Sequence, residues 1–191
     1  MALDSESRWR LVRMKRAKGT QEPVNTEPVI RKATESDLSS MVEIYNYYIQ
    51  NSVVTFDMDV MALSDWSEKF RWINELGLPF IVAESPSGQI IGFAYVAPWR
   101  QKAAFKRTVE DSIYLRPAAI GKRVGTKLLE QLLEQAKAAG VKEVVAVISD
   151  KGAESSIALH ERFGFKHQGH LGKVGFKFGR WLGTVLMQKS L

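Results

Sequence analysis

Hydrophobic positions recur along this chain at two different spacings, and each spacing predicts a different element. Four stretches carry apolar residues three and four positions apart, which predicts helices that bury one face. Seven shorter stretches are rich in β-branched and aromatic residues, as strands are. The expected helices are Leu38 to Ile49, Ser64 to Leu76, Lys127 to Ala139 and Ala153 to Phe163. The expected strands are Val29 to Ala33, Phe80 to Glu84, Gln89 to Val96, Thr108 to Leu115, Lys142 to Ile148, Phe165 to Leu171 and Thr184 to Gln188.

The order of these elements predicts an α/β domain built on a mixed sheet. The turn signal S-P-S-G separates the second and third strands and predicts an antiparallel hairpin. The dense run V-V-A-V-I within residues 142–148 is typical of a strand that is buried on both faces.

The stretch from Thr108 to Ala139 reads as a strand, a glycine-bearing loop and the start of a helix. Such a loop directs unpaired backbone N–H groups and the positive end of a helix dipole at one spot, where a phosphate can bind. The dinucleotide motif G-x-G-x-x-G and the nucleotide loop G-x-x-x-x-G-K-[ST] are both absent here. From the loop alone, an ordinary connection with surface Lys and Arg residues remains the alternative.

The loop and its flanks resemble those of a known enzyme family. The loop I-G-K-R-V-G, residues 120–125, resembles the [QR]-x-x-G-x-[GA] pyrophosphate loop of the GCN5-related N-acetyltransferases (GNAT). Ile120 stands where Gln or Arg is usual, and Arg123 where Gly is usual. The ordered segments T-V-E-D-S-I-Y-L-R-P, V-V-A-V-I-S-D, S-I-A-L-H-E-R-F-G-F and V-G-F-K-F-G-R-W resemble the phosphinothricin and methionine sulfoximine N-acetyltransferase branch over roughly residues 29 to 190.

The resemblance implies a GNAT fold, in which a mixed sheet flanked by helices splays between its middle strands, with acetyl-CoA in the gap. The expected cofactor-binding residues are Ile113, Tyr114, Leu115, Ile120, Gly121, Lys122, Arg123, Val124, Gly125, Thr126, Ala153 and Ser156. Ala153 stands where the family often has Asn.

Two residues are candidates for acid–base catalysis. Acetyl transfer to an amine needs a base for the amine proton and an acid for the departing thiolate. Glu110 matches the Glu of T-V-E in this branch and is the expected base, and its neighbour Asp111 is expected to face solvent on the other side of the strand. His160, where many relatives carry a tyrosine, is the expected acid. The alternatives are a solvated strand carboxylate and a satisfied helical histidine.

The acceptor pocket is expected to involve Phe56, Trp99, Arg100, Lys102 and Lys177. An arginine can bind the carboxylate of an amino-acid substrate in bidentate fashion. Relatives have Arg where Lys102 stands, so this chain keeps the positive charge there but loses the bidentate geometry of a guanidinium. Surface charge and core aromatics are the alternative interpretation.

Composition narrows the remaining possibilities. A length of 191 residues with 45% apolar residues fits one domain, predicted as 29–191, after a flexible basic extension of residues 1–28. The chain has no cysteine, which excludes thiol catalysis and suits a cytoplasmic location, and it shows neither a membrane span nor a metal-ligand cluster. A net charge of +6 suits a polyanionic cofactor, although the basic N-terminal residues leave nucleic-acid binding as an alternative.

The sequence therefore predicts an N-acetyltransferase that moves acetyl from acetyl-CoA directly to the α-amine of a small amino acid or analogue. Acetylation of a peptide N-terminus, a polyamine or an aminoglycoside is the enzymatic alternative. A non-catalytic acyl-CoA-binding protein is the non-enzymatic alternative. The family resemblance implies a small-molecule substrate and a homodimer. No nucleic-acid or membrane partner is expected.

Overall fold

A computed structural model describes residues 27–191 of the chain. The predicted basic extension lies outside the described residues except for its last two positions. The elements, in order, are β1 (Val29–Lys32), α2 (Leu38–Asn51), α3 (Leu63–Glu75), β2 (Phe80–Glu84), β3 (Ile90–Pro98), β4 (Thr108–Leu115), α4 (Val124–Ala138), β5 (Glu143–Ser149), α5 (Glu154–Arg162), β6 (Lys166–Lys177) and β7 (Arg180–Ser190).

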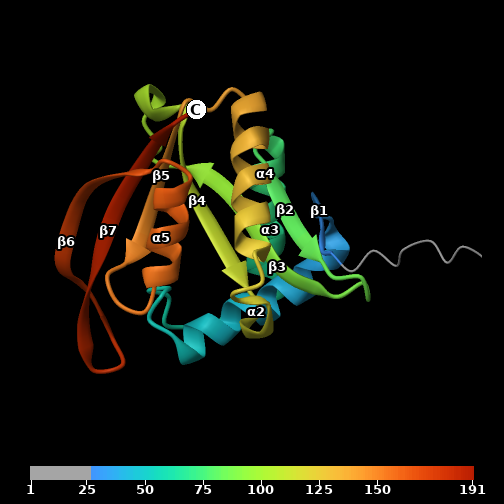
Figure 1. Cartoon of the computed structure of the whole chain (residues 1–191), viewed down its shortest axis with the longest axis horizontal. Coiled ribbons are helices and arrows are strands. Elements are labelled where there is room, and N and C mark those ends of the chain that lie inside the picture. The colour runs from blue at the N-terminus through green and yellow to red at the C-terminus, as the bar shows by residue number, and fades with distance from the viewer. Residues whose placement is uncertain (1–26) are drawn as a thin grey trace, which may run out of the picture.

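One seven-stranded sheet organises the described chain (Figure 1), with the strand order β1-β2-β3-β4-β5-β7-β6. Only β4 and β5 are parallel, and every other neighbouring pair is antiparallel. The predicted mixed sheet and the β2–β3 hairpin are thus confirmed.

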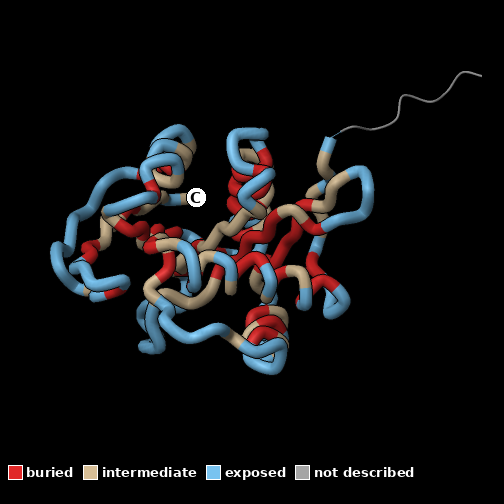
Figure 2. The backbone as a smooth tube through the Cα atoms, turned by 90° about the horizontal axis from the view of Figure 1, so that it is seen from below, coloured by how far each residue is buried: buried red, intermediate tan, exposed pale blue. Residues whose placement is uncertain are grey.

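Helices cover both faces of the sheet. In Figure 1, α4 and α5 lie in front of the sheet and α3 lies behind it. The front core joins leucines of α4 to β-branched and small residues of the sheet, such as Val144 and Ala146. The rear core joins α2 and α3 to an aromatic group around Trp66, Phe80 and Phe93. Figure 2 shows buried residues concentrated in the sheet and on the helix surfaces turned toward it.

The central strands separate, as the resemblance implied. Strands β4 and β5 pair only from Thr108↔Glu143 to Glu110↔Val145. Beyond that point β4 keeps its partner β3 up to Leu115, and β5 keeps its partner β7 up to Ser149. The sheet therefore opens between its two middle strands immediately after Glu110.

The last two strands are longer than the sequence predicted. They form an edge hairpin over Lys166–Lys177 and Arg180–Ser190, joined at Phe178 and Gly179. Both turn residues have positive φ, 49° and 72°, as a two-residue turn that matches the strand twist requires. The prediction ended β6 at Leu171 because the rest of that strand is almost wholly exposed and shows no alternation of buried and exposed residues.

Candidate active site

A cleft of about 550 Å³ occupies the gap between β4 and β5. Its walls come from residues 110–115 of β4, residues 146–149 of β5, the loop that leads into α4, and one side of α5. Two helix N-termini, those of α4 and α5, therefore border the same space. Among the described residues, none of the helices is long and apolar enough to cross a membrane.

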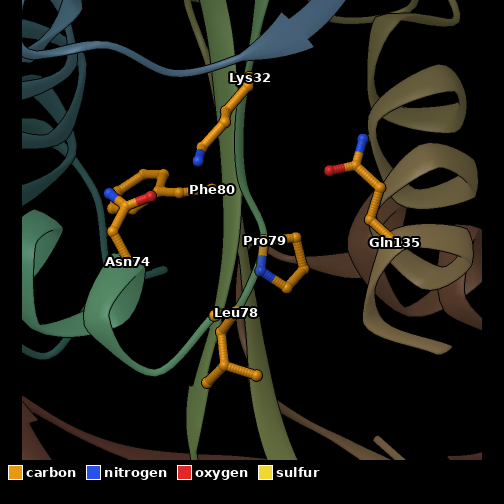
Figure 3. Close-up of a pocket in the computed structure, with 7 residues that line it drawn as sticks. Lys32, Asn74, Leu78, Pro79, Phe80 and Gln135 are labelled. Atoms are coloured by element: carbon orange, nitrogen blue, oxygen red, sulfur yellow. The ribbon is translucent and has the colours of Figure 1, made fainter. Parts of the chain in front are cut away.

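A second hollow of about 180 Å³ lies away from this cleft (Figure 3). Its walls include Lys32 of β1, Asn74 of α3 and Gln135 of α4. No carboxylate, hydroxyl or imidazole lines it. Because the predicted acid–base residues Glu110 and His160 both line the cleft between β4 and β5, that cleft is the candidate active site.

The entry to α4 has the backbone of an anion-binding loop. Gly121 has φ of 79°, and Arg123, which precedes the helix, has φ of 60° and ψ of 8°. Arg123 thus adopts the left-handed conformation that glycine adopts without steric cost. No side chain caps the helix, so the first N–H groups of α4 remain available to a ligand in the cleft.

The open edge of β4 offers a second set of backbone groups. The Tyr48 hydroxyl donates a 2.7 Å hydrogen bond to the Leu115 carbonyl. Backbone groups of alternate strand residues point to the same edge, so the N–H of Ile113 is directed into the gap as well. An extended ligand can pair with this edge as an additional strand. Tyr48, which the sequence did not single out as a site residue, lines the cleft.

Glu110 lies where the two strands separate and lines the cleft. Burial, and then the charge of Asp111, raise the pKa of Glu110 to about 7, against the opposing effects of Arg100 and Lys69. A carboxyl group with this pKa is well matched to accepting a proton near neutral pH.

Asp111 corrects one expectation. It was expected to face solvent, but only 8% of its surface is exposed. Its side chain lies on the α5 side, where Asp111 Oδ2 and His160 Nε2 share a 2.9 Å hydrogen bond. The expectation was wrong because β4 is a central strand with helices on both faces, so its second face is covered rather than solvated.

His160 is buried in the cleft wall between two acceptors. Its Nδ1 donates a 2.7 Å hydrogen bond to the Ser156 carbonyl, while Nε2 faces Asp111. Burial alone would lower the pKa of His160, but the Asp111 charge, its hydrogen bond and the Ser156 carbonyl together raise that pKa above its ordinary value.

Most of the predicted cofactor residues line one cleft together with both predicted catalytic residues. The exception is Lys122, an exposed loop residue that does not line it. The loop, the strand edge and the start of α5 are far apart in sequence, and the splay brings them together.

The five predicted acceptor residues lie outside the cleft lining. Phe56 packs against Gly175, and the Arg100 guanidinium lies 5.0 Å from the centre of the Trp99 ring. Lys102 is exposed. Lys177 is 2% exposed, and its Nζ donates a 2.9 Å hydrogen bond to the Thr55 carbonyl. Lys177 thereby ties β6 to the segment that carries Phe56.

Comparison with known proteins identifies the family. Residues 41–165 match the family model described as the acetyltransferase (GNAT) family. The chain belongs to the GNAT acetyltransferase family. It is 37% identical, over 85% of its length and 94% of the relative's, to the L-methionine sulfoximine/L-methionine sulfone acetyltransferase of Pseudomonas aeruginosa.

Two solved GNAT structures show the same architecture. A phosphinothricin acetyltransferase from Sinorhizobium meliloti, in complex with acetyl-CoA, superposes with a TM-score of 0.83 at 40% identity, covering 86% of this chain and 89% of that one. A ribosomal-protein-alanine N-acetyltransferase from Brucella melitensis gives 0.82 at 37% identity, covering 85% and 99%. The GNAT fold, with its divided central sheet, is therefore that of this chain.

Proposed function

We propose that this GNAT protein transfers the acetyl group of acetyl-CoA directly to the α-amine of a small amino acid or analogue, in a ternary complex. The observation that carries the proposal is the position of Glu110, a carboxyl with a pKa of about 7 where the splayed strands open. The names of the relatives support amino-acid analogues such as methionine sulfoximine and phosphinothricin as acceptors.

The cleft fits acetyl-CoA in two respects. The uncapped N-terminus of α4 can bind its pyrophosphate, with Arg123 adding a positive charge beside it. The open edge of β4 can pair with the extended pantetheine arm, as a strand would. Acetyl-CoA supplies the acetyl group as a thioester.

The protein's own groups then divide the work of the reaction. Glu110 takes a proton from the acceptor ammonium or amine, directly or through a water molecule, and so makes the nitrogen nucleophilic. The Ile113 N–H is directed at the gap and can stabilise the negative charge that develops on the carbonyl oxygen. The departing sulfur takes one proton, for which His160 is the proposed source. The acceptor roles of Phe56, Trp99, Arg100, Lys102 and Lys177 stay predictions, and Arg100 is electrostatically coupled to Glu110.

A thiol-release assay tests the function. Purified protein is mixed with acetyl-CoA and, separately, methionine sulfoximine, phosphinothricin, spermidine and an alanine-initiated peptide. We expect release with the amino-acid analogues and loss of that release in Glu110→Gln. Release with the peptide alone would favour the activity named for the Brucella relative. Acetyl-CoA binding without release from any amine would identify a non-catalytic binding protein.

We also propose a homodimer formed through the β6–β7 hairpin. Phe176 and Trp181 pack on each other across the hairpin at 5.4 Å and are 56% and 54% exposed. Other large apolar side chains on the same hairpin and its turn are equally exposed: Leu171, Val174 and Phe178. A contiguous apolar patch on an edge hairpin favours association with a second copy.

The molar mass in solution tests the dimer. We expect light scattering to give twice the chain mass for the wild type and the chain mass for Phe176→Thr/Trp181→Thr. The matched control is Val29→Thr, which removes an exposed apolar side chain from the opposite edge strand β1 and should leave the dimer intact. A monomeric wild type contradicts the proposal.

The domain boundary and the cellular location also stay proposals. We propose that residues 29–191 form the catalytic domain and that residues 1–28 are dispensable for it. A chain without residues 1–28 should therefore retain acetyl transfer, and any salt-sensitive retention on nucleic acid should vanish with those residues. The cytoplasmic location remains the expectation of the sequence.

A further inference from the structure

The Asp111–His160 pair is a charged arrangement that the cleft does not need for packing. The two side chains are 2% and 4% exposed, so both are removed from water. Asp111 Oδ1 has no hydrogen-bond partner among the described residues, although the group is buried. An apolar pair would fill this space at a lower desolvation cost, so a buried carboxylate here requires a functional explanation.

The two acceptors determine the protonation state of the imidazole. A backbone carbonyl can only accept a hydrogen bond, and so can an ionised carboxylate. Nδ1 faces the Ser156 carbonyl at 2.7 Å and Nε2 faces Asp111 Oδ2 at 2.9 Å, so beside an ionised Asp111 each ring nitrogen carries a proton. The Ser156 hydroxyl lies farther from Nδ1, at 3.5 Å, and the Phe165 ring packs edge-on against the imidazole at 4.8 Å. Among the described residues, the hydrogen-bond partners of the His160 ring are Ser156 and Asp111. Asp111, which comes from β4, is the one of these two that can carry a charge.

The pair also lies on one defined side of β4. Adjacent strand residues point to opposite faces, so Asp111 faces α5 and the α4 side of the sheet, whereas Glu110 faces the other. The predicted cofactor loop belongs to the face of Asp111. The base and the imidazolium are thus separated by the strand itself.

We propose that Asp111 is a positioning residue that holds His160 as an imidazolium on the cofactor side of β4. The proposal rests on the acetyl transfer proposed above, for which it names the state of the acid. When the carbon–sulfur bond breaks, its electron pair stays on sulfur. A proton of the Asp111–His160 pair moves to that sulfur, which leaves a carboxylate and a neutral imidazole. The charge of Asp111 is unchanged.

Nitrogen NMR of the full chain tests the protonation state without any measurement of activity. The His160 signals, assigned by their loss in His160→Gln, should show two protonated ring nitrogens at pH 7.5. In Asp111→Asn the midpoint of the His160 titration should fall by about 1 to 3 pH units. The signals of His167 and His170 should be the same in both proteins. A neutral His160 in the wild type at pH 7.5, or a midpoint unmoved by Asp111→Asn, overturns the proposal.

The pH profile of kcat separates this role from a merely structural one. Asp111 also raises the pKa of Glu110, so its removal should move both limbs of the profile to lower pH. At pH 8 the kcat of Asp111→Asn should fall by about 10-fold or more and should recover as the pH is lowered toward 6. A uniform loss at every pH would show that Asp111 serves only the structure. Glu130→Gln, which removes an exposed carboxylate from α4, should keep the wild-type profile.

Failure of the proposed function would look different from failure of this inference. A wild type that releases no thiol with any amine contradicts the acetyl transfer, whatever the state of His160. A wild type that is active but holds a neutral His160 contradicts only the role of Asp111.

Discussion

Replacing Glu110 by glutamine should remove the catalytic base and, at alkaline pH, make the fold more stable. The pKa of Glu110 is raised from 4.5 to about 7, chiefly by burial. The folded protein therefore binds this proton more tightly than the unfolded chain does. The stability that this tighter proton binding gives the folded protein is fully present below pH 4.5. It is lost as the pH rises through 7, above which the ionised carboxylate is held in an unfavourable site.

The size of the effect follows from the shift. Each pKa unit corresponds to 1.36 kcal/mol, so a rise of about 2.5 units corresponds to about 3 kcal/mol as an upper value for this half-buried group. The free energy of unfolding of Glu110→Gln, relative to the wild type, should thus increase by up to about 3 kcal/mol between pH 5 and pH 8. All other titrating groups are common to both proteins, so the difference isolates Glu110.

Urea unfolding of both proteins at pH 5, 6, 7 and 8 measures this difference in the free energy of unfolding. The kcat/KM of Glu110→Gln should be lower than that of the wild type by roughly 10²- to 10⁴-fold. Glu130→Gln, on the exposed side of α4, provides the control. The difference in free energy of unfolding between this variant and the wild type should not change with pH. A difference that stays flat with pH, or a wild type that is the more stable protein at pH 8, would refute the argument that burial raises the pKa of Glu110.

Two further predictions concern glycine geometry. Arg123→Gly and Arg123→Ala lose the same charge, but only glycine adopts the φ of 60° without cost, so the glycine variant should be about 1 kcal/mol more stable in urea unfolding. Equal stabilities would mean that the loop relaxes. Gly175→Ala would bring a Cβ to 2.6 Å from the Phe56 ring and should raise the KM for the amine several-fold while leaving that for acetyl-CoA unchanged. Gly169→Ala, in the same strand with open space around it, should change neither, and an unchanged amine KM in Gly175→Ala would remove Phe56 from the acceptor pocket.

The fold was largely predictable because most elements have one apolar face and one neighbour to bury it against. Leu128 and Leu132 on α4, for example, are wholly buried at the spacing that predicted the helix. The length of β6 was underestimated because it is an edge strand whose residues are almost all exposed, so no core imposes an alternation of buried and exposed positions. The opening between β4 and β5 came only from the family resemblance, since it depends on pairing between distant segments.

The sequence predicted many of the residues that line the cleft, but not the contacts among them. Glu110 and His160 were found from their motifs, while Asp111 was assigned to solvent by strand alternation alone. The alternation was correct, and the error lay in equating the second face of a central strand with water. The number of predicted helices could have corrected the assignment of Asp111. Four helices around one sheet leave a central strand no face exposed to solvent.

The opening of the sheet after Glu110 gives two adjacent carboxylates different chemical roles. Two neighbouring negative charges oppose each other's ionisation, and the partners nearby decide which group holds the proton. Asp111 has an imidazole at 2.9 Å, whereas Glu110 has only the longer-range fields of Arg100 and Lys69. The charge at Asp111 then adds to the burial that raises the pKa of Glu110 to about 7. In the proposed mechanism, the Asp111–His160 contact on one face of β4 therefore helps to set the base strength of Glu110 on the other face, so the proposed acid and base are coupled through adjacent residues.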